Sequence, residues 1–311
     1  MNRRAFIRRG ALGGFTLGIA KALHNTTIGY GQFGIGDNLQ TADIEQVAKA
    51  DMPALEWRER TIGDQPVRLT PSGIRYQRDG RWPRIDEDAP PIVHEFQRDL
   101  TAIHADEFTF AFSGIDSFFD TVETADVRPA MVTFLRNSMT ADPSLVETVT
   151  GVSPTRPQPL LTAFVELFRD RSRYDVPRYV AGSIDDNVLP FDANLRDPFE
   201  PDIDFELLAS HDDTIGMFCT EYTWLVIEAL HSVPAERQTP PVFGVQVRNR
   251  RHKHMYNGIG SVIRRDDELI IPMTFADYTD TTLIDDFRAG RFVDDSLDAY
   301  DTSHRADQIR W

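Results

Sequence analysis

The sequence has little of two residue types, because only one of its 311 residues is a cysteine, Cys219, and only three are lysines. A single cysteine excludes an internal disulfide, so the fold must depend on its hydrophobic core. Beyond the first 23 residues, no apolar run approaches the roughly 18 residues that a membrane-spanning helix needs. A basic excess is also absent, since 33 basic residues face 49 acidic ones and the net charge is −16. This balance argues against a nucleic-acid partner, which would need a basic face to neutralise its phosphates.

The strong negative charge indicates the surroundings in which the protein works. An acidic surface that is rich in arginine and poor in lysine is typical of proteins from strongly saline media, where salt screens the self-repulsion of the chain. The lysines are Lys21, Lys49 and Lys253. This composition bears on solubility and leaves the activity open.

The first residues have the pattern of an export signal. The twin-arginine stretch Asn2–Arg8 is followed by a weakly apolar segment, 10–23, that is rich in Gly and Ala. We therefore expect residues 1–22 to be a Tat-type signal with a cleavage site at Ala20–Ala22. The protein would then be extracytoplasmic, either secreted or at the cell surface, and would touch a membrane only through an uncleaved signal. The alternatives are a retained N-terminal anchor and a plain basic tail.

Hydrophobic patterns divide the rest of the chain. Residues 23–38 form a predicted linker, residues 39–90 a small β-rich unit that closes on the turn Asp79–Gly80, and residues 91–311 the core. Helical spacing predicts helices over 92–103, 130–135 and 160–168, whereas the alternating Phe108, Phe110 and Phe112 predict a buried strand. We expect an irregular loop over 182–204 and a solvated tail over 294–311.

The single cysteine lies at the start of a predicted helix. The apolar residues at helical spacing behind it are Tyr222, Leu225, Val226, Ala229 and Leu230. Trp224 and Ile227 occupy much of the other side, so we expect this helix to be buried nearly all round. If it begins near Gly216, its first amide groups and its dipole would stabilise a thiolate at Cys219, which is the nucleophilic form of cysteine.

Three predicted strands follow this helix and bring in a histidine and an aspartate. Runs rich in β-branched and aromatic residues cover 242–248, 255–263 and 269–275. His254 precedes the second run, and Asp277 follows the third. A thiol at a helix N-terminus, an imidazole on a neighbouring strand and a carboxylate at the end of the next strand suit acyl transfer, because the imidazole takes the thiol proton and the carboxylate orients the ring.

With these residues the sequence resembles the transglutaminase-like (papain-like) superfamily. The matching pairs are Cys219 with Tyr222, His254 with Tyr256, and Asp277 with Thr279. Gly216 departs from the tightest form of the pattern by one position, and the resemblance covers about residues 215–282. It implies an α+β fold with helices packed on an antiparallel sheet. It also implies peptidase, amidase or amide cross-linking activity on a protein or peptide substrate, without a cofactor.

Each residue of this set also has an ordinary structural interpretation. A lone cysteine in an apolar helix is often a small buried hydrophobe. His254 could end a strand in solvent, and Asp277 or Asp280 could cap a short helix predicted over 281–287. Asp280 is also the alternative to Asp277 as the third member of the site. His252 and His254 make a His-x-His pair, as in some metal sites, but no further ligands at a characteristic spacing accompany them.

The sequence thus predicts an exported, cysteine-dependent amide-bond hydrolase or acyl transferase. In this hypothesis Cys219 is the nucleophile, His254 the base and Asp277 the orienting acid. No metal or other cofactor is expected. The alternative is an exported binding or structural protein that keeps the fold without the chemistry.

Overall fold

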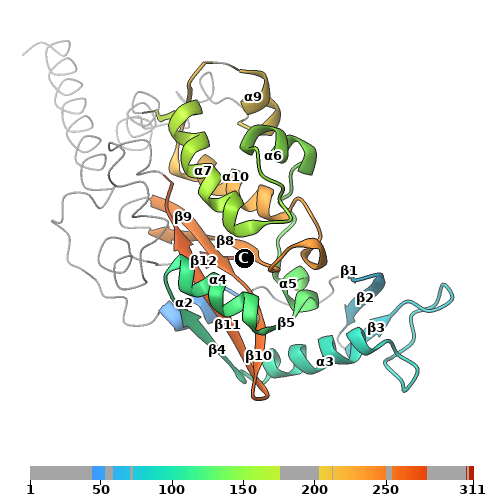
Figure 1. Ribbon diagram of the computed structural model, residues 1–311. Helices are drawn as coiled ribbons and strands as arrows, with labels where there is room; N and C mark the ends of the chain where they lie inside the picture. Colours follow the sequence, from blue (N-terminus) through green and yellow to red (C-terminus); the bar gives the residue numbers. More distant parts are fainter. Residues whose placement is uncertain are drawn as a thin grey trace, which may run out of the picture.

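The described part of the chain is built around one mixed sheet with helices on both faces (Figure 1). The computed structural model describes residues 44–52, 59–70, 73–175, 203–211, 213–249, 254–278, 306 and 308–311. The predicted signal and linker lie outside these ranges. So do the helix expected over 281–287, almost all of the expected loop, and the residues His252, Thr279 and Asp280.

The central sheet is mainly antiparallel and follows the order β12-β8-β9-β11-β10-β5. Strand β4 pairs in parallel with β11 off this path. The strands of the sheet are β4 (Phe108–Phe112), β5 (Asp126–Val127), β8 (Phe243–Asn249), β9 (His254–Gly260), β10 (Ile263–Arg265), β11 (Glu268–Ala276) and β12 (Gln308–Arg310). The strands expected from the sequence are therefore confirmed, except that the run 255–263 breaks into β9 and β10.

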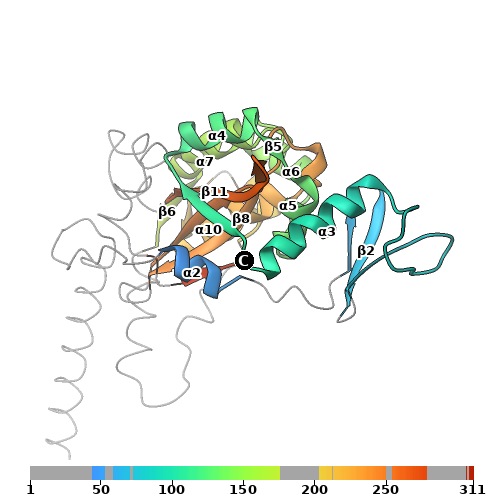
Figure 2. The ribbon, with the colours of Figure 1, turned by 90° about the horizontal axis from the view of Figure 1, so that it is seen from below.

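Two layers of helices cover the sheet, and each buries its own hydrophobic cluster. The first layer consists of α4 (Ile115–Thr124), α6 (Pro143–Thr150), α7 (Pro157–Arg171), α9 (Phe205–Ser210) and α10 (Cys219–His231). The second consists of α2 (Ile44–Ala50), α3 (Pro91–His104) and α5 (Pro129–Leu135). In the view from below, α4, α6 and α7 lie along one side of the sheet and α2 lies along the other (Figure 2). The predicted helices α3, α5 and α7 are confirmed.

A small antiparallel sheet lies beyond α3 at one end of the described structure (Figures 1 and 2). It consists of β1 (Glu59–Ile62), β2 (Gln65–Thr70) and β3 (Gly73–Tyr76). The apolar residues that alternate along β2 and β3 are all buried, namely Val67 and Leu69 in β2 and Ile74 and Tyr76 in β3. Asp79 and Gly80 both have positive φ in the following turn. Within the unit predicted as β-rich, residues 44–50 form the helix α2. This helix packs against β12, and the indole of Trp311 donates a hydrogen bond to the carbonyl of Ala48.

The described end of the chain corrects one expectation. We predicted a solvated tail over 294–311, but residues 308–310 form β12, which pairs antiparallel with β8. Ile309 is fully buried, and the ring of Trp311 lies 5.3 Å from that of Phe243. The prediction was wrong here because these two apolar side chains, placed two residues apart, both reach the core. None of the helices in the described ranges is long and apolar enough to cross a membrane.

Candidate active site

Cys219 is the first residue of helix α10 and its side chain is buried. The short strand β7 (Ile215–Met217) leads directly into the helix, so the helix begins at Cys219 and not near Gly216, as we had expected. Phe218 occupies the N-cap position, and its amide donates a 2.6 Å hydrogen bond to the carboxylate of Glu221. The cysteine therefore lies at the positive end of the helix dipole, where a thiolate is stabilised.

Aromatic packing fixes the first turn of this helix. The ring of Tyr222 lies edge-on against Phe168 of α7, with ring centres 4.8 Å apart. The ring of Tyr278, directly after Asp277, contacts the same Phe168 at 5.5 Å. One side chain of α7 thus holds both the helix of the cysteine and the end of strand β11. Trp224 on α10 is 42% exposed, so the expectation of burial nearly all round is wrong at this position.

His254 and Asp277 form a buried pair on adjacent strands. His254 is the first residue of β9, and Asp277 directly follows β11, which pairs antiparallel with β9. The imidazole Nε2 lies 2.5 Å from Oδ2 of Asp277. Their side chains are only 4% and 1% exposed, so solvent scarcely screens the pair. The sequence had placed both residues at these ends of neighbouring strands.

The surroundings of His254 favour its protonated form. Burial alone would lower the pKa of His254, but the charge and the hydrogen bond of Asp277, together with contact to the Cys219 thiol, raise it well above its usual value. Nε2 faces Asp277, whereas Nδ1 is buried and makes no hydrogen bond to the described residues. The structure therefore brings Cys219, His254 and Asp277 together in one line of contacts.

A hydrogen bond across the helix–sheet boundary ties the two halves of this site. The side-chain amide of Asn257, on β9, donates a 2.9 Å hydrogen bond to the carbonyl of Thr223 in α10. The hydroxyl of Thr223 in turn donates to the carbonyl of Cys219 at 2.8 Å. Asn257 and Phe168 were not singled out from the sequence. The signal for Asn257 was a polar amide inside an otherwise apolar strand.

The metal alternative has no counterpart in the described residues. His252 lies outside them, and within them no group of three or more His, Cys, Asp or Glu side chains is placed to hold a metal ion. The short contact of His254 is to the carboxylate of Asp277, another member of the predicted site. We therefore treat His254 as part of the Cys219 site.

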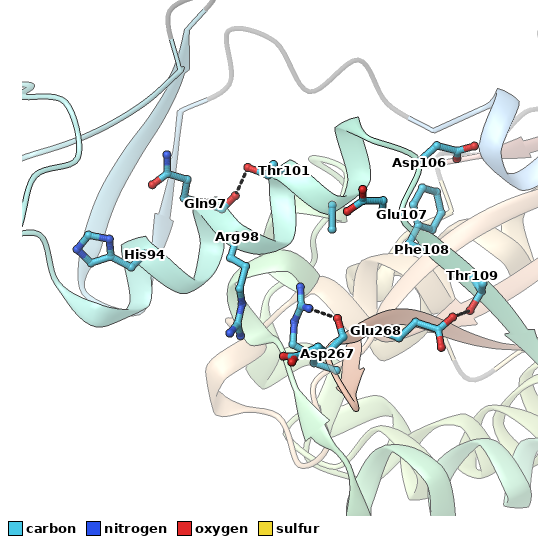
Figure 3. Close-up of a pocket in the computed structure, with 12 residues that line it drawn as sticks. His94, Gln97, Arg98, Thr101, Asp106, Glu107, Phe108, Thr109, Asp267 and Glu268 are labelled. Atoms are coloured by element: carbon cyan, nitrogen blue, oxygen red, sulfur yellow. Dashed lines mark hydrogen bonds between the residues drawn. The ribbon is translucent and has the colours of Figure 1, made fainter.

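A concave region lies away from this site. A groove of about 660 Å³ runs between α3, the start of β4 and the turn from β10 to β11 (Figure 3). Its charged groups are engaged locally: Thr109 donates to Glu268 at 3.1 Å, and Asp106 pairs with Lys49 at 3.1 Å. It contains no cysteine and no member of the Cys219 line, so its chemistry suggests a solvated surface rather than a reaction site.

Comparison of the chain with protein-family models, with curated proteins and with solved structures found no match. The functional argument therefore depends on the geometry of the site itself.

Proposed function

We propose that this protein is a cysteine-dependent amide-bond hydrolase or acyl transferase of the transglutaminase-like kind, exported by the twin-arginine pathway. The observation that carries the proposal is the buried His254–Asp277 pair, 2.5 Å between Nε2 and Oδ2, in contact with a thiol at a helix N-terminus. A structural cysteine needs none of these neighbours.

In the proposed reaction the imidazole of His254 takes the proton of the Cys219 thiol as general base. The sulfur attacks the substrate carbonyl carbon, so a C–S bond forms and the carbonyl electron pair moves to oxygen. The backbone N–H of Cys219 would donate to this oxyanion. The Nδ1 proton then moves to the leaving nitrogen as the C–N bond breaks, which leaves a thioester. Water or an amine attacks the thioester while neutral His254 accepts its proton.

Asp277 has a supporting role in this scheme. Its carboxylate accepts from Nε2–H, and so would orient the ring and stabilise the positive charge on it. Asp277→Asn would keep the shape of the side chain while weakening both effects. We expect it to lower turnover by a factor on the order of 10² to 10⁴.

The test is to screen the purified protein, in high salt, for hydrolysis of esters and peptides and for amine incorporation into protein. Cys219→Ala and His254→Ala should abolish the activity found. His94→Ala is the matched control, because His94 is exposed on α3, away from the site. If Cys219→Ala and His254→Ala both keep full activity, the proposal is wrong, and the exported binding protein becomes the better interpretation.

A further inference from the structure

Arg248 is a half-buried cation that has no counter-ion among the described residues. It lies on β8 opposite Met255, next to the pair that Asn249 forms with His254. Its Nε is buried without a hydrogen-bond partner. No ion pair joins its guanidinium to any carboxylate of the described residues, although the chain has 49 acidic residues. A buried N–H that lacks an acceptor costs about 1–3 kcal/mol of folding free energy. The Nε–H of Arg248 therefore destabilises the fold unless a ligand supplies the acceptor.

Two arginines at the other end of this sheet are neutralised by a shared carboxylate. Arg128 donates from Nε to Asp99 at 2.8 Å, and Arg264 contacts the other oxygen of Asp99 at 2.9 Å. Both cations are therefore structural. Arg248 differs from Arg128 and Arg264 because it has no ion pair among the described residues. This difference indicates that its role is not a structural one.

Arg248 lies on the side of the sheet that carries the helix of Cys219. It shares a face of β8 with Gly244, whose neighbours belong to α10. Burial and the nearby Arg310 lower the pKa of Arg248, whereas the charge of Cys219 raises it. Arg310 lies on the edge strand β12 opposite Gln246 and is exposed, so solvent screens its charge. An anion bound beside Arg248 would thus lie near Cys219.

We propose that Arg248 forms an anion subsite beside Cys219 and receives a carboxylate of the acyl-donor substrate, which would be an acidic peptide. The planar guanidinium can bind both oxygens of a carboxylate, and the buried Nε–H would gain its missing acceptor. This inference rests on the proposed function, because it assigns the substrate class of the same site.

The experiment compares two alkylating reagents that differ in charge, iodoacetate and iodoacetamide. Both form a C–S bond to Cys219 and release iodide, so the ratio of their rates reports how strongly the site attracts an anion. Arg248→Gln should lower the iodoacetate-to-iodoacetamide ratio by a factor on the order of three to ten, the effect of removing one nearby charge. Arg310→Gln, which removes an exposed cation of the same sheet edge, should change the ratio less than twofold.

The outcomes separate this inference from the proposed function. If folded wild-type protein reacts but Arg248→Gln leaves the ratio unchanged, the anion subsite is wrong and the thiol chemistry survives. An equal fall in Arg310→Gln would mean a diffuse positive surface and would also overturn the subsite. If Cys219 reacts with neither reagent until the protein is unfolded, both proposals are wrong. As a second readout, kcat/KM should favour acidic over neutral peptides in the wild type and lose that preference in Arg248→Gln.

Discussion

Asn257 donates a hydrogen bond from its side-chain amide to the backbone carbonyl of Thr223, and this single bond connects the strand of His254 with the helix of Cys219. Cys219, the proposed nucleophile, belongs to the helical layer, whereas His254 lies on β9 and Asp277 directly follows β11. Their alignment therefore depends on how the helix sits on the sheet. Asn257 is a residue that sets this position without touching a substrate.

Replacing Asn257 with Leu should reduce turnover more strongly than it reduces the free energy of unfolding. The lost hydrogen bond should lower the free energy of unfolding by about 1–2 kcal/mol. Turnover should fall at least tenfold, because misplacement of a nucleophile by about 1 Å can cost a factor on the order of 10². Urea unfolding and steady-state kinetics would measure the two effects.

Thr274→Val is the matched control for Asn257→Leu. Thr274 is equally buried in β11, but its hydroxyl has no hydrogen-bond partner, so its loss should leave stability unchanged or improve it. Equal losses of activity in the two variants would show that the effect comes from general core damage and not from the bond to Thr223.

The His254–Asp277 pair should make stability depend on pH. The folded-state pKa of His254 is raised above the unfolded value of about 6.5, so the stabilisation is fully present below that pH. It is lost as the pH rises through the folded-state pKa. The free energy of unfolding should therefore decline with pH above neutrality in the wild type, and the decline should be smaller in Asp277→Asn. Parallel curves for the two proteins would contradict this assignment.

Phe168→Leu should impair activity out of proportion to its effect on stability. The substitution removes the ring that contacts both Tyr222 and Tyr278, which flank the nucleophile and the acid. Phe118→Leu is the comparison, since Phe118 is also fully buried in the same cluster and packs on Phe119. Each should cost on the order of 1–2 kcal/mol of stability. Only Phe168→Leu should also lower kcat, and an equal loss in both would remove the positioning role.

Asp99 should be important for stability and not for chemistry. This buried carboxylate accepts from Arg128 and Arg264, and so joins α3 to the chain after β5 and to β10. Asp99→Ala leaves two arginines without their shared partner and should cost about 3–5 kcal/mol. Asp106→Asn, which weakens an exposed pair with Lys49, should cost less than about 1 kcal/mol. Chemical unfolding of both variants measures the difference, and comparable losses would show that burial of Asp99 is unimportant.

The elements that could be predicted from the sequence are those in which buried residues recur at the spacing of a helix or of a strand. The stripe of α3 and the alternation of β4 each present one face to a core, so their patterns stand out. Helices α4 and α6 were missed, because the adjacent Phe118 and Phe119 looked like an isolated aromatic cluster and α6 buries little of its surface. Strand β12 was missed because three residues are too few to show a period.

The members of the candidate site could be named from the sequence, but their supports could not. Cys219, His254 and Asp277 are distinctive residue types at the ends of predicted elements. Phe168 is 51 residues before Cys219, as their numbers show, and only tertiary packing brings its helix against Tyr222. Arg248 was part of a run of charged residues, where nothing local distinguishes a cation without a counter-ion from its neighbours.

Two positions of strand β9 must be glycine, and this requirement can be used to find other chains with the same site. A side chain at Gly260 would place its Cβ 2.4 Å from the ring of Phe243, and one at Gly258 would meet Val245 at 2.7 Å. The strand therefore reads His-x-Tyr-x-Gly-x-Gly from residue 254, and it is the cross-strand neighbours that require the glycines. A database pattern built from this heptapeptide and a preceding Cys-x-x-Tyr would select for the geometry of the site even where the rest of the sequence has diverged.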